Sequence, residues 1–166
     1  MKKIVLLLIG MIGAATTFAG DNPKAKEEAT VVFGKARFTV LTPELIRMEY
    51  SDSAVFEDRA SLVFINRETE VPAFKKKTGG KSLTLTTDKL VLKYTDNGRP
   101  FSEDNLSIAL KEGKKIAAVW KPGMTDTLNL KGTFRTLDGV DGWDNYPNME
   151  PGLLSRSGWV LVDDSK

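Results

Sequence analysis

The sequence predicts an all-β fold, an antiparallel β-sandwich with long loops towards its C-terminal end. Two observations predict it: apolar and polar side chains alternate over short runs, and clusters of turn-forming residues separate those runs. A third observation is that no apolar stripe of helical period occurs after the first residues. Because alternation covers only one face of a strand, we expect half-buried antiparallel strands around one core.

The expected strands follow one another at short intervals after a first strand near Val31. Each run places every second apolar side chain on the same face. The alternating runs are Arg37–Val40, Ile46–Tyr50, Leu83–Thr86, Leu90–Tyr94, Leu106–Leu110 and Ile116–Trp120. The turn clusters that bound them are Thr42–Glu44, Thr78–Gly80, Thr87–Lys89, Asp96–Gly98 and Glu112–Lys114.

Two further strands are expected without clear alternation. Leu62–Ile65 is wholly apolar, so it fits a strand covered on both faces at a sandwich centre or a domain interface. We interpret the charged residues before it, Glu57, Asp58 and Arg59, as a local ion pair at the strand entrance, although a functional role stays open. The last expected strand is Trp159–Val162.

The first residues have the pattern of a secretory signal peptide. Lys2 and Lys3 precede the apolar run Ile4–Ile12, and small residues follow it. Thr17 and Ala19 offer the small side chains that predict cleavage after Ala19. The run is too short for a membrane span of about 20 residues. We therefore expect a periplasmic or secreted product, with no membrane association after cleavage.

The remaining chain divides into a leader and one domain. Residues 20–30 are charged and poor in large apolar side chains, which predicts a flexible leader. Residues 31–166 form the expected β-sandwich, and a chain of this length buries roughly two-thirds of its unfolded surface in one core. The sequence has no cysteine, so this core must supply the stability without disulfides.

Composition excludes several classes of function. The chain has no histidine and no cysteine, which excludes thiol nucleophiles, Ser-His-Asp triads and ordinary zinc sites. Loss of Lys2 and Lys3 with the signal peptide leaves 22 of the 24 basic residues, equal to the 22 acidic residues. A neutral chain does not favour a nucleic-acid partner, and we interpret Lys75–Lys77 with Lys81 as solvation of a hairpin end.

Four segments of the sequence resemble the N-terminal β-sandwich domain of glycoside hydrolase family 31, the family of α-glucosidases and α-xylosidases. They cover nearly all of the chain after the leader, and the last two, in this order, are the more specific. The segments are Arg37–Tyr50, Phe56–Ser61, Asn129–Asp138 and Glu150–Asp164.

The resemblance implies a galactose-mutarotase-like sandwich followed by a (β/α)8 barrel that carries two catalytic aspartates. A barrel needs about 250 residues, so we expect it C-terminal to Lys166, as the partner of this domain. No catalytic residue is carried over to this chain, and we expect it to be inactive alone. The implied substrate of the full enzyme is an α-linked oligosaccharide, and no cofactor is implied. The alternative is a free-standing carbohydrate-binding or interaction module.

The Gly-, Asp- and Trp-rich final third holds the candidate substrate-binding residues. Aromatic faces pack on sugar rings while carboxylates accept sugar hydroxyls, which suggests Asp138, Trp143, Asp144 and Trp159. Trp143 and Asp144 belong to residues 139–152, which by resemblance are our candidate for a loop at the rim of the barrel's pocket. The competing interpretation of Trp159 is a core residue.

Two other carboxylate arrangements are poor candidates for chemistry. Asp138, Asp141 and Asp144 recur every third residue and invite a calcium hypothesis, but Asp-Gly turns explain this spacing equally well. We expect no metal. Asp163 and Asp164 are adjacent, and neighbours on a strand point to opposite faces, so they do not form a cooperating catalytic pair.

Overall fold

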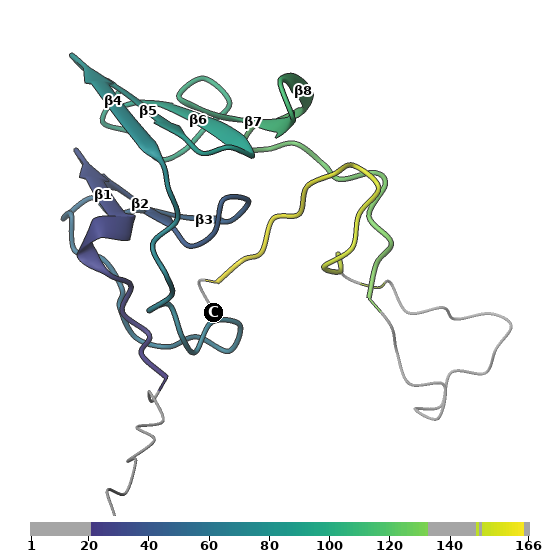
Figure 1. Cartoon of the computed structure of the whole chain (residues 1–166), viewed down its shortest axis with the longest axis horizontal. Coiled ribbons are helices and arrows are strands. Elements are labelled where there is room, and N and C mark those ends of the chain that lie inside the picture. The colour runs from purple at the N-terminus through teal and green to yellow at the C-terminus, as the bar shows by residue number, and fades with distance from the viewer. Residues whose placement is uncertain (1–20, 133–148, 150, 165–166) are drawn as a thin grey trace, which may run out of the picture.

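The computed structural model describes residues 21–132, 149 and 151–164, in which eight strands form two antiparallel sheets (Figure 1). The described residues contain no α-helix, only the 3-10 turn η1 (Glu27–Ala29). The all-β prediction is confirmed to this extent. None of the described helical residues forms an apolar segment long enough to cross a membrane. The expected signal peptide lies outside the described residues.

The smaller sheet has three strands in the order β1 (Thr30–Phe33), β2 (Ala36–Val40) and β3 (Ile46–Tyr50). All of β2 is buried, because its two neighbours flank it and both of its faces are covered. Its turn from β1 depends on Gly34, which has a φ of +60°. This positive φ favours glycine, and a Cβ there would also force the carboxylate of Asp96 to move.

The larger sheet runs in sequence order from β4 to β8. The alternation predicted from sequence reappears in β5 and β6, where buried and more exposed residues take turns. Its strands are β4 (Lys75–Gly79), β5 (Ser82–Thr86), β6 (Leu90–Thr95), β7 (Leu106–Glu112) and β8 (Lys115–Trp120).

Residues from the inner faces of both sheets form one hydrophobic cluster. Phe38 of β2 meets Tyr94 of β6 with ring centroids 5.3 Å apart, and Phe101 packs on the same tyrosine at 5.6 Å. Figure 1 shows the three-stranded sheet below the five-stranded sheet, with their strands facing one another. Burial of these large side chains supplies the main apolar contribution to folding.

Two strand predictions are wrong. Residues 62–65 form no strand, and the Leu62 side chain is 96% exposed. The Ser61 amide instead donates to the Phe64 carbonyl at 3.1 Å, which folds this segment into a local turn. Residues 159–162 are likewise outside any strand and pair with no ladder among the described residues.

Two connections also differ from simple expectation. The Asp96–Gly98 cluster starts a longer connection that ends at Asn105, whose side chain donates to the Pro100 carbonyl at 3.0 Å. Residues 21–29, within the expected leader, include η1, and the buried Ala29 lies beside the start of β1.

Candidate functional site

The structure describes one of the four predicted substrate-binding residues. Asp138, Trp143 and Asp144 lie outside the described residues, as does Asp141 of the calcium hypothesis. Trp159 is half-buried and packs against the core, with its ring centroid 6.3 Å from that of Trp120. This packing agrees with the core interpretation of Trp159, which nevertheless also lines a groove.

Hydrogen bonds join the two ends of the Gly-, Asp- and Trp-rich segment. The Asn129 side-chain amide donates to the Gly152 carbonyl at 3.0 Å, and its oxygen accepts from the Gly152 amide at 2.8 Å. The Asn129 side chain thereby forms the same pair of hydrogen bonds with Gly152 that a neighbouring strand's backbone would form. An isolated β-bridge between Asn129 and Ser155 lies beside it. The base of the segment is thus closed by direct contacts.

Asp126 completes this closure. Its carboxylate accepts hydrogen bonds from the hydroxyls of Ser157 at 2.6 Å and Ser155 at 2.8 Å, and from the Asn129 amide at 3.0 Å. Desolvation of Asp126 favours its neutral form, but these donors outweigh it and lower the pKa of the carboxyl. An ionised aspartate with this many donors acts as a structural anchor.

A groove of about 1410 Å³ opens beside β3, β7 and β8. The described end of the chain, residues 156–164, lines one side of it, and Val55 and Phe56 line another. Val55 is 74% exposed and Leu161 is 58% exposed, so the groove presents apolar side chains to solvent. Within the part of the chain described, this is a wide apolar surface and not a closed catalytic pocket.

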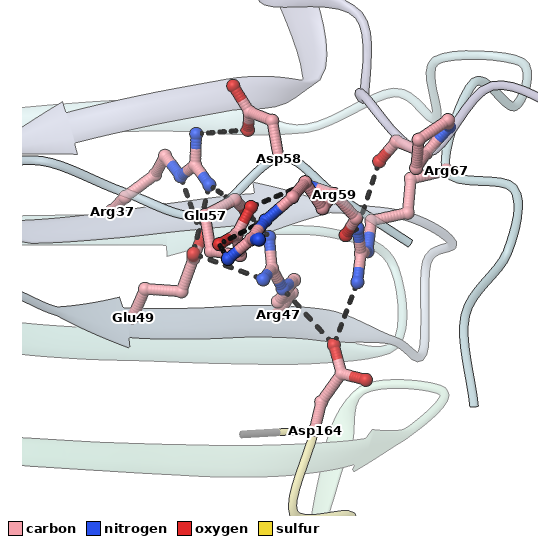
Figure 2. Close-up of polar contacts among 9 residues, drawn as sticks. Arg37, Arg47, Glu49, Glu57, Asp58, Arg59, Arg67 and Asp164 are labelled. Carbon is pink, nitrogen blue, oxygen red and sulfur yellow. Dashed lines mark hydrogen bonds and ion pairs between the residues drawn. The ribbon is translucent and has the colours of Figure 1, made fainter. Parts of the chain in front are cut away.

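A polar cluster covers the outer face of the three-stranded sheet, centred on Arg37 (Figure 2). The Arg37 guanidinium binds Glu49 through two bonds, from Nε at 2.6 Å and from Nη2 at 2.9 Å. Its Nη1 donates to Asp58 at 2.6 Å, and the guanidinium carbon lies 4.9 Å from the centre of the Phe56 ring. Burial lowers the pKa of Arg37, but hydrogen bonds from its guanidinium to Glu49 and Asp58 raise it overall.

Arg67 and Asp164 extend the cluster to the described end of the chain. Arg67 is 2% exposed and donates to Asp164 at 3.0 Å, while Arg47 approaches the same carboxylate at 3.5 Å. Arg67 also donates to the carbonyl of Pro23 at 3.0 Å and to that of Arg59 at 2.8 Å. One buried guanidinium therefore connects segments from the beginning, middle and end of the chain.

Beside these residues lies a cavity of about 200 Å³, lined by Arg37, Arg47, Arg67 and Asp58 among others. Burial lowers the pKa of Arg47 despite the neighbouring Glu49. Each acidic member of the cluster is bound by an arginine: Glu49 and Asp58 by Arg37, and Asp164 by Arg67. Carboxylates whose oxygens already accept hydrogen bonds from arginines suit a structural network better than proton transfer.

The charged segment before Leu62 contains the local ion pair expected from sequence. Arg59 binds Glu57 at 2.6 Å, and hydrogen bonds from the Arg59 side chain and backbone lower the pKa of Glu57 to about 2. Asp58 instead reaches across to Arg37. No group of three or more acidic side chains among the described residues is arranged to hold a metal ion.

Sequence reasoning missed Arg67 and the contacts of Asp164. The two residues are 97 positions apart, and neither lies in an alternating run that marks a buried face. The only local signal is that a charged residue follows an apolar segment.

No protein-family model matches the chain, and a search of the curated proteins finds no match.

Proposed function

We propose that this chain is the non-catalytic N-terminal domain of an exported α-glycosidase of the family 31 type. In this proposal the two sheets form a galactose-mutarotase-like sandwich that packs against a (β/α)8 barrel. The full enzyme hydrolyses O-glycosyl bonds of α-linked oligosaccharides, and this domain shapes the rim of the substrate pocket. The support comes from the resemblance of four sequence segments and from the surface described next.

The observation that carries the proposal is a concentration of exposed apolar side chains in two loop segments. Single exposed leucines are ordinary on a monomer, whereas a contiguous apolar area marks an interaction site. The β3–β4 connection and the segments after β8 contribute most of them. They are Val55, Leu62, Val63, Ile65, Leu128, Leu130, Leu153, Leu154 and Leu161.

Of these nine side chains, Val55 from the first segment and Leu161 from the second line the groove, which is therefore the place where the two segments meet. An open groove with exposed apolar side chains offers a second domain a surface to pack against. Arg47 and Glu49 at the same groove, 3.1 Å apart, give it a polar boundary.

The polar cluster supports a non-catalytic role. A retaining glycosidase needs a nucleophilic carboxylate and a second carboxyl that carries a proton, about 5 Å apart. In the cluster, Glu49, Asp58 and Asp164 are each bound by an arginine, an arrangement typical of a structural ion-pair network and not of an acid and nucleophile pair. We assign the chemistry of the full enzyme to the barrel.

The first test is hydrolysis by the purified chain. We expect no release of nitrophenol from aryl α-glucosides or aryl α-xylosides, measured by absorbance over hours at high protein concentration. Hydrolysis above the rate of a heat-denatured control would contradict a non-catalytic role.

The second test concerns the groove in a protein that carries both this domain and the barrel. The double variant Val55→Glu with Leu161→Glu should lower the yield of active enzyme, because charges then face the docking surface. Val32→Glu is the matched control, since Val32 is an equally apolar residue, 54% exposed, that does not line the groove. Equal losses in the two variants would remove the support for docking here.

A further inference from the structure

The outer face of the five-stranded sheet carries a row of lysines and hydroxyls. Leu83 and Leu85 of β5 are buried, so Thr84 between them points to the opposite face. Thr84 pairs with Lys77 of β4 on one side and with Lys93 of β6 on the other. Lys93 in turn pairs with Ser107 of β7, which completes a row across four strands.

A second row runs beside the first. Lys75 of β4 pairs with Thr86 of β5, which lies on the same outward face as Thr84. Lys75, Lys77 and Lys93 are exposed. Figure 1 shows that the three-stranded sheet lies on the other side of this sheet.

This face is positively charged, although the whole chain has nearly equal numbers of acidic and basic residues. Residues 75–93 contain one acidic residue, Asp88, against six lysines, at positions 75, 76, 77, 81, 89 and 93. Three of the six, Lys75, Lys77 and Lys93, lie on the outward face. Among the described residues, no ion pair includes Lys75, Lys77 or Lys93. The ammonium groups on this face are thus available to an external anion.

Protection of a sheet edge explains only part of the pattern. Lysines on an edge strand prevent pairing with another chain, which accounts for Lys75 and Lys77 on β4. Lys93 is on β6, the middle strand of the sheet, where no edge needs protection. It lies two strand spacings from Lys77, about 10 Å away across Thr84. Two cations at this spacing repel each other until an anion is held between them.

We propose that this face binds an anionic polysaccharide, a sugar polymer that carries carboxylate or sulfate groups. The lysines pair with the acidic groups, and the hydroxyls of Thr84, Thr86 and Ser107 exchange hydrogen bonds with sugar hydroxyls. An extended polymer suits a flat strand surface on which cations recur at regular spacing. This binding is separate from the docking groove and does not depend on the glycosidase proposal.

The outward residues favour a polysaccharide over other polyanions. Single-stranded nucleic acid sites use aromatic stacking, and membrane-binding surfaces insert large apolar side chains. On the edge strand β8 the exposed Val119 lies opposite Ala109, at the far end of this face from β4. The outward positions of β5, β6 and β7 offer no aromatic residue and only a half-buried valine as a large apolar one. They are Ser82, Thr84, Thr86, Val91, Lys93, Thr95, Ser107 and Ala109.

The test is titration of the purified protein with defined polymers at low salt, followed by calorimetry. Polygalacturonate supplies carboxylates and dextran sulfate supplies sulfates, while plain dextran is the neutral control. We expect binding to at least one anionic polymer, weakened by added salt, and none to dextran. The relative affinity of the two polymers shows which acidic group is preferred.

The deciding variant is Lys77→Gln with Lys93→Gln. Its control is Lys114→Gln in the β7–β8 turn with Lys115→Gln at the start of β8, which removes the same charge elsewhere. We expect the first pair to weaken binding roughly tenfold or more, since each lysine near an anionic surface contributes several-fold. The second pair should change affinity less than about twofold. Circular dichroism and melting temperature verify that both variants fold.

Three results would overturn the proposal. An unchanged affinity in the Lys77 and Lys93 variant would exclude this face, and equal losses in both variants would indicate a general charge effect. Tighter binding to single-stranded DNA or to vesicles containing phosphatidylglycerol than to either polysaccharide would assign the face to a different polyanion.

Discussion

Both sheets alternate apolar and polar side chains, but their outer faces differ in what covers them and in how their charges are paired. The outer face of the three-stranded sheet is covered by the β3–β4 connection and by the described end of the chain, and its arginines are paired with carboxylates. The outer face of the five-stranded sheet keeps its lysines exposed and unpaired among the described residues. Alternation therefore predicts that a face is polar but not whether the chain covers it.

The difference follows from the kind of cation on each face. Arginine presents a rigid, planar set of donors that binds several acceptors at once. Arg37 binds two carboxylates and one carbonyl, and Arg67 binds one carboxylate and two carbonyls. Lysine is a flexible, strongly hydrated point charge that loses more by burial. The covered face thus uses arginine, and the open face uses lysine.

The largest expected effect is on the covered face, from Arg67→Met. Removal of the buried Arg67 leaves the half-buried Asp164 without its closest cation, which costs about 3–5 kcal/mol in the free energy of unfolding. Urea denaturation measures it. The control is Arg99→Met, because Arg99 is exposed and its side chain makes no hydrogen bond among the described residues. A loss below about 1 kcal/mol would mean that the network is not needed to hold this face closed.

Asp164→Asn should have a smaller effect, because the amide retains the shape and one acceptor while losing the charge that binds Arg67 and Arg47. We expect destabilisation of about 1–3 kcal/mol. Faster proteolysis of residues 156–164 should accompany it, since Asp164 fixes this segment to the sheet. If cleavage remains as slow as in the parent protein, other contacts of the segment suffice.

The sequence predicted every strand except β4, whose Lys75–Lys77 were interpreted as a hairpin end, and it predicted the covered face poorly. Both failures have one physical reason. Alternation in runs such as Leu90–Tyr94 is local information, and the strands formed where it occurs. Leu62–Ile65 has no alternation, and its apolar character gave no indication of whether anything covers it. The contact between Arg67 and Asp164 joins residues 97 positions apart, which no local pattern encodes. The candidate residues Asp138, Trp143 and Asp144 remain untested predictions.

Glu57 makes the stability of the covered face depend on pH. Its pKa falls from 4.5 to about 2 because Arg59 donates to its carboxylate. A depressed pKa contributes stability that is complete above pH 4.5 and is lost as the pH falls to about 2. Glu57→Gln should therefore flatten the fall in melting temperature across this interval, by a small amount because both side chains are largely in water. An unchanged slope would show that the ion pair does not affect folding.

The smallest effect is expected on the open face, from Lys93→Gln. An exposed lysine without a partner contributes little to folding, so the free energy of unfolding should change by less than about 0.5 kcal/mol. Any change should be a gain, because the repulsion between Lys93 and Lys77 across Thr84 is removed. The gain should shrink in high salt, which screens exposed charges but not the buried network around Arg67. Urea denaturation of this variant and of Arg67→Met at two salt concentrations tests the comparison. A clear loss of stability in Lys93→Gln would mean that charges also stabilise the open face. The contrast between arginine and lysine would then no longer explain the two faces.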